Sequence, residues 1–314
     1  MHFNALLAVS ILATSAQAFE VPYFTKRQAK CPQVWFDISK ELSGMFLGAD
    51  GQCTDAARAS IRGVFHDCFP DGGCDGSLML FDAEVARANN VPMTATMQTL
   101  RAMATKYNVT GADLLMFAGC KFCAPVTFLT RSLTYSTAHA VATCPGGPVT
   151  QTLIGRKDAT GPCPDNQLPP ANAPGDGVTA RFAAKGFSAK DVAALIGAHT
   201  VSRQFVTNPN AVGAAQDSTP GKWDITFFVE TIKNTAPFRF ISDINLANQN
   251  EVGPWMTRFS ADKAAWDAAF VDAMARLELL GNDKTSMVDC TAALPQAQAK
   301  ARRDDRFAKL FAWR

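Results

Sequence analysis

The sequence predicts a mostly α-helical protein of two helical lobes, and two observations lead to this fold class. Apolar residues recur three and four positions apart in Trp35 to Phe46, in Thr96 to Tyr107 and in Ala261 to Leu280, which is typical of helices with one buried face. The stretch from Leu153 to Gly177 contains GRKDATGPCPDNQLPPANAPGDG, whose Pro and Gly residues favour an extended linker between the lobes. With 314 residues, 47% of them hydrophobic, the chain is long enough to bury a packed core.

Charge and hydropathy argue against two classes of partner. The formal net charge is +2 and the sequence has no basic tract, which argues against nucleic acid. No apolar run approaches the roughly 20 residues that a membrane-spanning helix needs. We therefore expect neither nucleic acid nor a membrane as a partner.

The N-terminus has the pattern of a secretory signal peptide. An apolar stretch, LLAVSILA, is followed by SAQA, whose small residues suit cleavage after Ala18, so residues 1–18 are expected to be the signal. The pair Lys26 and Arg27 allows a second cleavage, which would make residues 19–27 a propeptide. An ordinary Lys-Arg pair on an exposed terminus is the alternative, and both remain open.

Secretion implies an oxidising compartment, where the nine cysteines are interpreted as a disulfide set rather than as a zinc site. Because nine is odd, at least one cysteine is left without a partner. The sequence Asn108-Val-Thr110 is a glycosylation sequon, which suits a secreted surface.

The segment from Ser60 to Asp82, SIRGVFHDCFPDGGCDGSLMLFD, carries the first group of candidate residues. If it begins as a helix, Arg62 and His66 are four residues apart and project from one face, with Phe65 beside them. This spacing predicts a face suited to acid–base chemistry.

Directly after this face comes a candidate cation site. Asp67 turns toward another face of the helix, and the Gly-rich turn PDGGCDGS follows with Asp75 and Ser77. Their oxygens could close back on Asp67 around a hard cation.

A second pair of motifs follows the linker. Ser188 and Asp191 form a capping box that opens a helix, DVAALIGAHT, and this helix carries His199 near its end. The later stretch DSTPGKWD spaces three more oxygen-bearing side chains like a second cation loop, namely Asp217, Thr219 and Asp224.

The four histidines narrow the choice of site. His2 falls in the signal and His139 in an anomalous segment, which leaves His66 and His199. A lone helical histidine is more often structural than a ligand, but here each of the two stands beside its own cation loop, and this combination favours a functional pair.

Taken together, these motifs resemble those of the secreted plant-type haem peroxidases, closest to the fungal class II group and with some features of the secreted plant enzymes. The resemblance runs from about Cys31 to Pro295 and rests on WFDI, SIRGVFHD, GCDGSLMLFD, TGADLLMFAG, CPGGP, GRKDAT, ARFAAKGFSAKDVAALIGAHT and DSTPGKWD. It implies a single, monomeric domain over residues 28–314, with haem b between a distal lobe at about 28–155 and a proximal lobe at about 175–295. A short C-terminal tail would follow.

The resemblance also implies roles on the distal side. His66 would be the general base that takes a proton from H₂O₂ and returns it to the departing oxygen. Asn90 would hold His66 by a hydrogen bond that keeps its reactive nitrogen unprotonated. Arg62 stays charged and would stabilise the negative charge that develops as the O–O bond breaks. Phe65 would pack over the haem, although it could equally be an ordinary core residue.

On the proximal side, the resemblance makes His199 the axial iron ligand, with its second ring nitrogen donating to a carboxylate. Asp243, in FRFISDINL, is the expected carboxylate. The alternatives are weaker, because Asp224 is needed by the cation loop and Asp262 and Asp267 lie on a helix with its own apolar stripe.

The same resemblance implies two Ca²⁺ sites. The distal set is Asp67, Gly73 through its carbonyl, Asp75 and Ser77. The proximal set is Thr200, Asp217, Thr219, Lys222 through its carbonyl, and Asp224. Either loop could instead be a capped turn without a metal.

Departures from the family pattern bear on the reducing substrate. Relatives that oxidise manganese use three carboxylates, and the matching positions here are Asp55, Ala59 and Phe205, so one acid of three remains. Ligninolytic relatives place a surface Trp five residues before the proximal histidine, where this chain has Ala194. The expected partners are therefore H₂O₂ and small phenols or aromatic amines, oxidised in one-electron steps by a secreted enzyme.

By resemblance, Cys53 pairs with Cys144, Cys31 with Cys290, and Cys68 with Cys74. The cysteines left over are Cys120, Cys123 and Cys163. The segment from Cys120 to His139 interrupts the family's helix and is either a genuine loop carrying a CxxC pair or a translated intron. If this segment impairs turnover, the alternative function is a secreted haem- and Ca²⁺-binding protein that acts by binding a partner.

Overall fold

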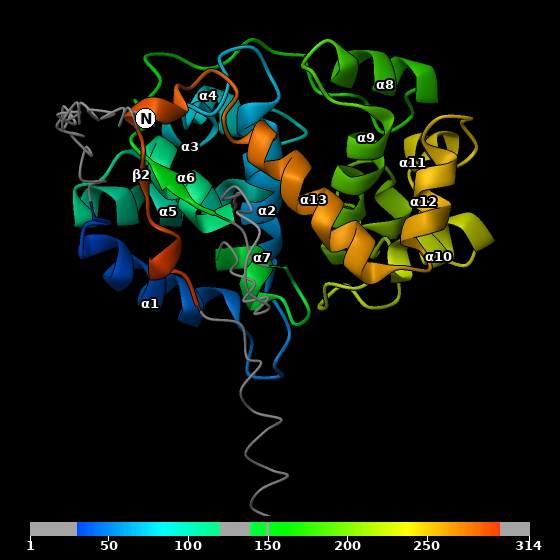
Figure 1. The fold of residues 1–314 in the computed structure, drawn as a ribbon, viewed down its shortest axis with the longest axis horizontal. Helices are drawn as coiled ribbons and strands as arrows, with labels where there is room; N and C mark the ends of the chain where they lie inside the picture. The colour runs from blue at the N-terminus through cyan, green and yellow to red at the C-terminus, as the bar shows by residue number, and fades with distance from the viewer. Residues whose placement is uncertain (1–29, 120–138, 149–150, 296–314) are drawn as a thin grey trace, which may run out of the picture.

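The computed structural model describes residues 30–119, 139–148 and 151–295. The expected signal peptide, the propeptide, the Cys120 and Cys123 pair and the C-terminal tail lie outside these residues. The described part is mostly helical, as the sequence predicts, and its helices form two groups side by side (Figure 1).

The first lobe contains α1 to α7, which stand on the left of Figure 1 and run from blue to green. Its helices are α1 (Val34–Phe46), α2 (Asp55–Cys68), α3 (Ser77–Leu80), α4 (Asp82–Val85), α5 (Thr94–Tyr107), α6 (Gly111–Gly119) and α7 (His139–Thr143), with a 3₁₀ turn at Val91–Met93. Helix α2 packs between α1, α5 and α6, and its first turn is capped by Thr54, whose hydroxyl accepts from the N–H of Ala57 at 3.3 Å.

The second lobe was expected to run from about residue 175 to about 295, but it ends with α13, because the chain after Leu277 returns to the first lobe. Its helices are α8 (Gly175–Ala183), α9 (Ala189–Ile196), α10 (Thr226–Lys233), α11 (Ile241–Ala247), α12 (Gly253–Phe259) and α13 (Lys263–Leu277), with 3₁₀ turns at Gly197–Val201 and Pro209–Ala211. Helix α13 runs diagonally through the middle of the molecule and packs against α9 (Figure 1). Its predicted stripe is buried, since Trp266, Phe270, Met274 and Leu277 are all below 4% exposed.

The chain returns to the first lobe after α13. Strand β2 (Val288–Asp289) pairs antiparallel with β1 (Leu153–Ile154), so that Leu153 faces Asp289 and Ile154 faces Val288. Two further 3₁₀ turns, Lys284–Ser286 and Thr291–Ala293, flank β2. The last described residues therefore complete the first lobe.

Three disulfides have the pairing that the resemblance implied: Cys31 with Cys290, Cys53 with Cys144, and Cys68 with Cys74. The first ties the start of the described chain to its end, and the second ties the segment before α2 to the end of α7. The third closes the turn after α2. Cys163 is buried and takes part in none of these bonds.

The helix that was expected to carry His199 ends earlier than the sequence suggested. The capping box is present, because Ser188 Oγ accepts from Asp191 N while Asp191 Oδ2 accepts from Ser188 N, but α9 stops at Ile196 and His199 lies in the 3₁₀ turn that follows. Gly197 packs so closely on α13 that a Cβ atom there would lie 2.5 Å from Nε1 of Trp266. Close packing between the two helices therefore sets the position of His199.

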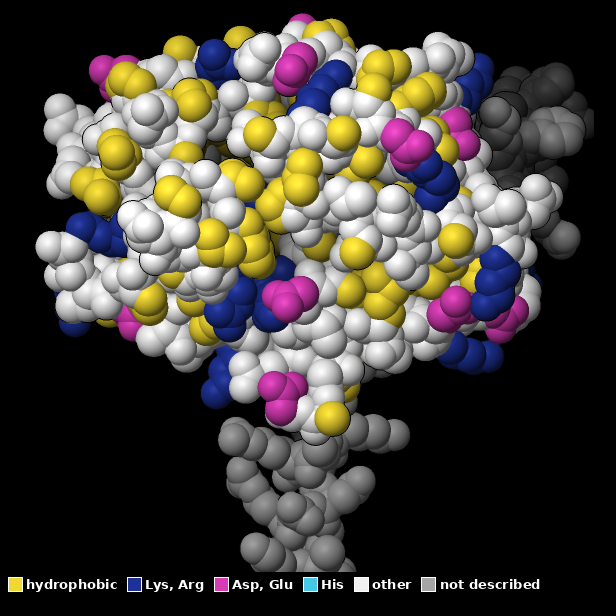
Figure 2. Space-filling model, turned by 180° about the vertical axis from the view of Figure 1, so that it is seen from behind, with side chains coloured by type: hydrophobic (Ala, Val, Ile, Leu, Met, Phe, Trp, Pro, Cys, Tyr) yellow, Lys and Arg dark blue, Asp and Glu magenta, His cyan; other side chains and the backbone are white. Residues whose placement is uncertain are grey.

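The surface carries mixed charge. On the face drawn in Figure 2, lysine and arginine side chains alternate with aspartate and glutamate, without a broad field of one sign. Within the described ranges, no helix combines the length and the apolar character that crossing a bilayer requires.

Candidate active site

A cavity lies between the two lobes and contains the candidate catalytic residues. Helix α2 lines it with Arg62, Phe65 and His66, and the 3₁₀ turn after α9 lines it with His199. Much of the remaining wall is apolar, contributed by α8, α9, α11, α13 and the Pro-rich linker. The two histidines that the sequence singled out therefore share one cavity.

On the first side of the cavity, His66 is held at both ring nitrogens. Asn90 Oδ1 lies 2.7 Å from His66 Nδ1, and the Asn90 side-chain nitrogen donates to the backbone oxygen of Glu84 at 2.9 Å. Because that amide nitrogen is the donor to Glu84, the oxygen is left as acceptor, and His66 Nδ1 carries the proton. His66 Nε2 is then unprotonated and accepts from Arg62 Nε at 3.1 Å.

The environment of His66 favours the neutral imidazole. Burial lowers its pKa to about 3, and the positive charge of Arg62 adds to this effect, while the hydrogen bond to Asn90 opposes it. The pKa of Arg62 is also lowered by burial, to about 10, which leaves the guanidinium charged at neutral pH. The pair thus combines a neutral base with a fixed cation.

Phe65 both lines the cavity and packs among other aromatic side chains, the two roles that the sequence left open. Its ring lines the cavity, and it stacks on Phe182 of α8 with ring centroids 5.8 Å apart and also contacts Phe69. It therefore forms part of the cavity wall and part of the packing between the two lobes.

On the opposite side, Asp243 is the carboxylate beside His199. His199 Nδ1 lies 3.1 Å from Asp243 Oδ2, and Asp243 is fully buried. The rings of Phe227 and Phe240 stand edge-on to the imidazole, with centroids 5.5 and 5.6 Å away. With Nδ1 donating to Asp243, Nε2 keeps its lone pair and is the atom of His199 that can bind a metal.

The three other carboxylates that were considered have different partners. Asp224 Oδ1 accepts from the backbone of Thr226, and Asp262 caps α13 through the N–H of Ala265. Asp267 accepts from Nε1 of Trp223 at 3.2 Å and from Lys263.

The expected distal cation set gathers around a fully buried Asp67. Its two oxygens accept from the backbone N–H groups of Gly76 at 2.9 Å and Leu78 at 3.1 Å, and Asp75 Oδ1 accepts from Ser77 N at 3.1 Å. The hydroxyl of Ser77 is buried and has no hydrogen-bond partner among the described residues. Burial raises the pKa of Asp67 to about 8, and the charge of Asp75 adds to this effect.

The fourth member of that set is Gly73, in the turn that the Cys68–Cys74 disulfide closes. Its φ is +79°, and a Cβ atom there would lie 2.3 Å from the backbone oxygen of Leu280. Only glycine fits this position.

The expected proximal set gathers in the same way. Thr200 Oγ1 donates to Asp217 Oδ2 at 2.6 Å, and Thr219 Oγ1 donates to Asp224 Oδ1 at 3.1 Å. Burial raises the pKa of Asp217 to about 7, with Asp224 adding to it. Lys222 joins this loop through its backbone N–H, which donates to the oxygen of Thr219.

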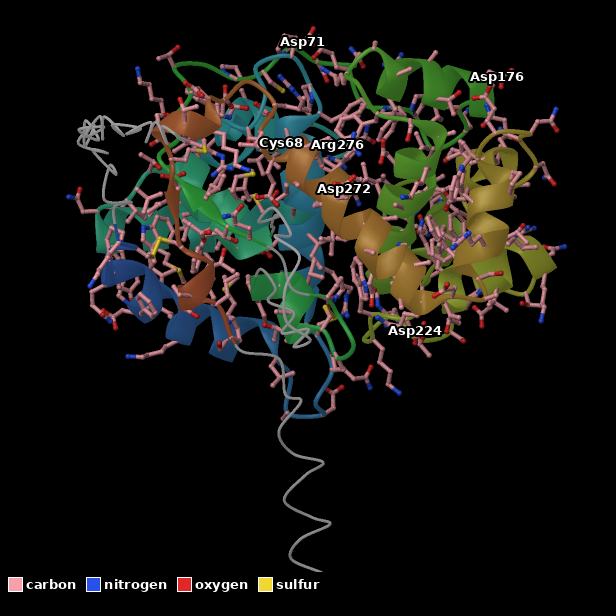
Figure 3. The ribbon with its side chains drawn as sticks, in the orientation of Figure 1. Cys68, Asp71, Asp176, Asp224, Asp272 and Arg276 are labelled. Atoms are coloured by element: carbon pink, nitrogen blue, oxygen red, sulfur yellow. A yellow bond between two sulfur atoms is a disulfide. The ribbon has the colours of Figure 1, made fainter. Side chains whose placement is uncertain are left out.

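The two candidate cation loops lie far apart. Figure 3 shows Cys68 at the upper end of α2 and Asp224 on a loop at the lower edge of the second lobe. Each set has only two carboxylates, and the described residues contain no group of three or more His, Cys, Asp or Glu side chains placed to hold a metal. A cation at either loop would therefore depend on hydroxyl and carbonyl oxygens as well, which are ligands that Ca²⁺ accepts.

Two features of the cavity had no sequence signal. Leu168 to Ala171 line it, although their composition indicated only an extended linker. Phe182 of α8 completes the wall beside Phe65. Both are contacts between lobes, which helical periodicity does not report.

The cavity suits haem b. Its apolar walls can take a flat macrocycle, and His199 Nε2 can bind iron from one side while His66 and Arg62 face the other. The second carboxylate oxygen of Asp243, Oδ1, is buried and meets no hydrogen-bond donor among the described residues. Asp243 therefore acts on His199, through Oδ2.

Comparison with known proteins agrees with the resemblance found in the sequence motifs. The family model described as "Peroxidase" matches residues 45–262. Ligninase LG2 of Phanerodontia chrysosporium is 28% identical, over 94% of this chain and 86% of its own length. The low-redox potential peroxidase of Taiwanofungus camphoratus is 30% identical, over 83% of this chain and 77% of its own. Manganese peroxidase 3 of Phlebia radiata is 29% identical, over 78% and 71%.

Proposed function

This chain belongs to the peroxidase family, and from that premise we propose that it is a secreted haem peroxidase that uses H₂O₂ to oxidise small phenolic or aromatic donors in one-electron steps. The observation that supports this most directly is the pairing of His66 with Asn90 on one side of a cavity and of His199 with Asp243 on the other. The three disulfides of the described residues support an oxidising compartment.

Haem b, bound through His199 Nε2, would supply the iron at which H₂O₂ is reduced and the electrons of the donor are received. His66 Nε2 would take a proton from one oxygen of H₂O₂ and deliver it to the other, so that the second oxygen leaves as water. Arg62 cannot act as the base because it stays charged, and its guanidinium would stabilise the negative charge on the departing oxygen. Asn90 would keep the proton on Nδ1 and so leave Nε2 ready to accept.

On the opposite side, Asp243 would hold His199 in the tautomer that presents Nε2 to the metal. A buried carboxylate at 3.1 Å from Nδ1 also makes the imidazole a stronger electron donor. This would lower the reduction potential of the haem iron and so stabilise its oxidised states.

The surroundings of Phe205 support aromatic donors over manganese. Phe205 and Val206 line the cavity and are 38% and 45% exposed, which gives an apolar rim where a manganese site would need a carboxylate. The remaining acid, Asp55, is paired with Arg58, whose Nη2 donates to its Oδ1 at 2.7 Å. Ala194 is fully buried, so a surface relay through that position is not supported.

We also propose one Ca²⁺ at each of the two oxygen-rich loops. The orphaned Ser77 hydroxyl and the raised pKa of Asp67 support the distal site, because a buried carboxylate that is hard to ionise alone is stabilised by a cation. The proximal site is supported by Asp217 and Asp224, whose carboxylates accept from the hydroxyls of Thr200 and Thr219 in one loop.

The test is peroxide-dependent oxidation of a phenol by the purified, haem-loaded chain. We expect turnover that needs both H₂O₂ and haem, with an absorption spectrum that changes on adding H₂O₂. Haem binding without any spectral change or phenol oxidation would contradict the proposal and favour the alternative, a haem- and Ca²⁺-binding protein without turnover. The ordered contacts of Arg62, His66 and Asn90 favour the enzyme.

A further inference from the structure

One turn of the backbone holds both candidate catalytic side chains. Arg62 Nη2 donates to the backbone oxygen of Asn89 at 2.8 Å, and His66 Nδ1 meets the side chain of the next residue, Asn90, at 2.7 Å. The turn is closed by the N–H of Asn90, which donates to the oxygen of Arg87 at 2.7 Å. The position of this turn, from Glu84 to Val91, therefore sets the positions of Arg62 and His66 together.

The outer side of the turn is hydrogen-bonded to Cys163, which lies in the linker between the lobes. The backbone N–H of Cys163 donates to Glu84 Oε2 at 2.8 Å, and its thiol donates to Glu84 Oε1 at 3.0 Å. Arg87 approaches the same residue, with Nη1 lying 3.3 Å from the sulfur and Nη2 donating to the backbone oxygen. Three separate atoms of Cys163 thus contact two residues of the turn.

Glu84 is the link between Cys163 and the catalytic histidine. Its side chain is fully buried and both carboxylate oxygens accept from Cys163, while its backbone oxygen receives the side-chain amide of Asn90. A buried carboxylate needs such donors, because leaving one oxygen without a partner costs stability. The side-chain conformation of Glu84 therefore depends on its contact with Cys163, and the position of the Asn90 side chain depends on Glu84.

We propose that Cys163 is a positioning residue for the peroxidase reaction, since it anchors through Glu84 and Arg87 the turn that orients Arg62 and His66. This inference rests on the proposed function and adds a role for a cysteine outside the disulfides of the described residues.

The chemistry of the thiol suits this role. Burial raises the pKa of Cys163 to about 12, and the hydrogen bond with Glu84 acts in the same direction. The thiol therefore stays protonated and can donate to Glu84 Oε1. A protonated, buried thiol also reacts poorly with H₂O₂, because the thiolate is the form that peroxide oxidises. Cys163 can thus persist in a protein that consumes peroxide.

The experiment compares Cys163→Ala with Cys163→Ser in the haem-loaded chain. Two rates are measured: kcat/KM for H₂O₂, and association of cyanide, which needs no turnover but requires that HCN give up its proton on the side of His66. Since a displacement of about 1 Å in an active site can cost about 10²-fold, we expect Cys163→Ala to slow both rates by about tenfold. Cys163→Ser keeps a donor and should stay within about twofold, and kcat/KM for the phenol should stay within about twofold in both variants.

Ser188→Ala is the matched control. Ser188 Oγ also donates to a buried carboxylate, that of Asp191, at 2.7 Å, but in the second lobe. Loss of this donor should leave cyanide association unchanged. If Ser188→Ala slowed cyanide association as much as Cys163→Ala does, the effect would be general destabilisation and the inference would be wrong.

Glu84→Gln is the second variant, in case Cys163→Ala does not fold. In one orientation the glutamine amide would face the N–H of Cys163, donor against donor, and in the other it would meet only the weak sulfur acceptor of the thiol, so in both it should slow cyanide association by a similar factor. Unchanged rates in Cys163→Ala would overturn the inference, and if that variant does not fold, unchanged rates in Glu84→Gln would do so. Equal losses in Cys163→Ser and Cys163→Ala would also overturn it. An inactive wild type that still binds cyanide would overturn the proposed function instead, and the inference would then be decided by the cyanide rates.

Discussion

Asp243 and His199 are joined by one carboxylate oxygen, Oδ2, at 3.1 Å from Nδ1, while the other carboxylate oxygen is buried and meets no hydrogen-bond donor among the described residues. Among the described residues, His199 is therefore the hydrogen-bond donor that faces the negative charge of Asp243. This relationship makes the electron-donating strength of His199 sensitive to a single side chain.

The first prediction concerns that charge. Asp243→Asn keeps an oxygen beside Nδ1 but removes the negative charge, so the reduction potential of the haem-loaded chain should rise. We expect a shift of about 60 to 120 mV, which is a factor of about 10 to 100 in the one-electron equilibrium constant. Spectroelectrochemical titration measures it. Asp243→Glu retains the charge and is the control, and an unchanged potential in the asparagine variant would contradict the role given to Asp243.

The second prediction separates the two histidines. His66→Ala should still bind haem but lose about 10²- to 10⁴-fold in kcat/KM for H₂O₂, because the group that moves the proton is gone. His199→Ala should instead change the absorption spectrum in the absence of H₂O₂, since the axial ligand is lost. The same spectral change in both variants, with equal loss of haem, would be inconsistent with assigning them to opposite sides of the cavity.

The third prediction concerns the acid side of the pH profile. The pKa of His66 is lowered to about 3, so Nε2 can accept a proton throughout the range above that value. The kcat/KM for H₂O₂ should therefore stay level as the pH falls from 7 to about 4 and decline only as it nears 3. Stopped-flow measurements across this range provide the profile. A decline centred on the ordinary histidine pKa of about 6.5 would show that His66 is not held neutral by its surroundings.

The fourth prediction concerns cation removal. Without a cation, the pKa of Asp67 is raised to about 8 and that of Asp217 to about 7, so the folded chain holds protons that the unfolded chain, with ordinary carboxyl pKa values, has released. The stability of the metal-free chain must then fall as pH rises toward 8. His66 contributes little above its unfolded pKa of about 6.5, so the window from pH 6.5 to 8 isolates the carboxyl effect.

In this window, the chain treated with a chelator should melt at progressively lower temperature as pH rises, and Ca²⁺ should remove the trend. Each kcal/mol corresponds to roughly 1.5–2 °C for a chain of this size. Thermal unfolding followed by circular dichroism gives the two curves. Coincident curves with and without Ca²⁺ would argue that the loops are capped turns.

The fifth prediction concerns manganese. Ala59→Glu combined with Phe205→Asp restores three acids at the matching positions, yet Asp55 stays paired with Arg58. We expect little Mn²⁺ oxidation from this double variant and several-fold loss of phenol oxidation, because the apolar rim at Phe205 is gone. Efficient Mn²⁺ oxidation by the double variant would show that the Asp55–Arg58 pair does not block the site. The double variant carrying Asp55→Asn as well is the control.

The sequence was a good guide wherever the signal is local. The helices at Val34–Phe46, Thr94–Tyr107 and Lys263–Leu277 follow from apolar periodicity, and the capping box at Ser188 from four residues. The linker expected from Leu153 to Gly177 is without helix from Gly155 to Pro174, but its ends were placed too far out, because β1 occupies Leu153–Ile154 and α8 begins at Gly175. The three disulfides could be paired only through the resemblance, because spacing alone does not determine connectivity.

What the sequence could not give depends on contacts between distant segments. The end of α9 before His199 reflects the close approach of Gly197 to Trp266, and no pattern around Gly197 reports a residue so far along the chain. The bonds from Cys163 to Glu84 are equally remote, since polar contacts in a linker have no periodicity. Cys163 therefore looked like a cysteine left over from pairing.

The return of β2 to β1, together with the bond between Cys31 and Cys290, has a consequence for synthesis of the chain. The first lobe is discontinuous in sequence, with the second lobe inserted between its parts. During translation α1 to α7 emerge early but lack the strand and the disulfide partner that complete them until the last part of the chain has left the ribosome. Such long-range closure is slow, and it leaves apolar surface exposed in the meantime. Assembly of this protein should therefore be post-translational, and chains ending before Cys290 should aggregate rather than accumulate as a folded half.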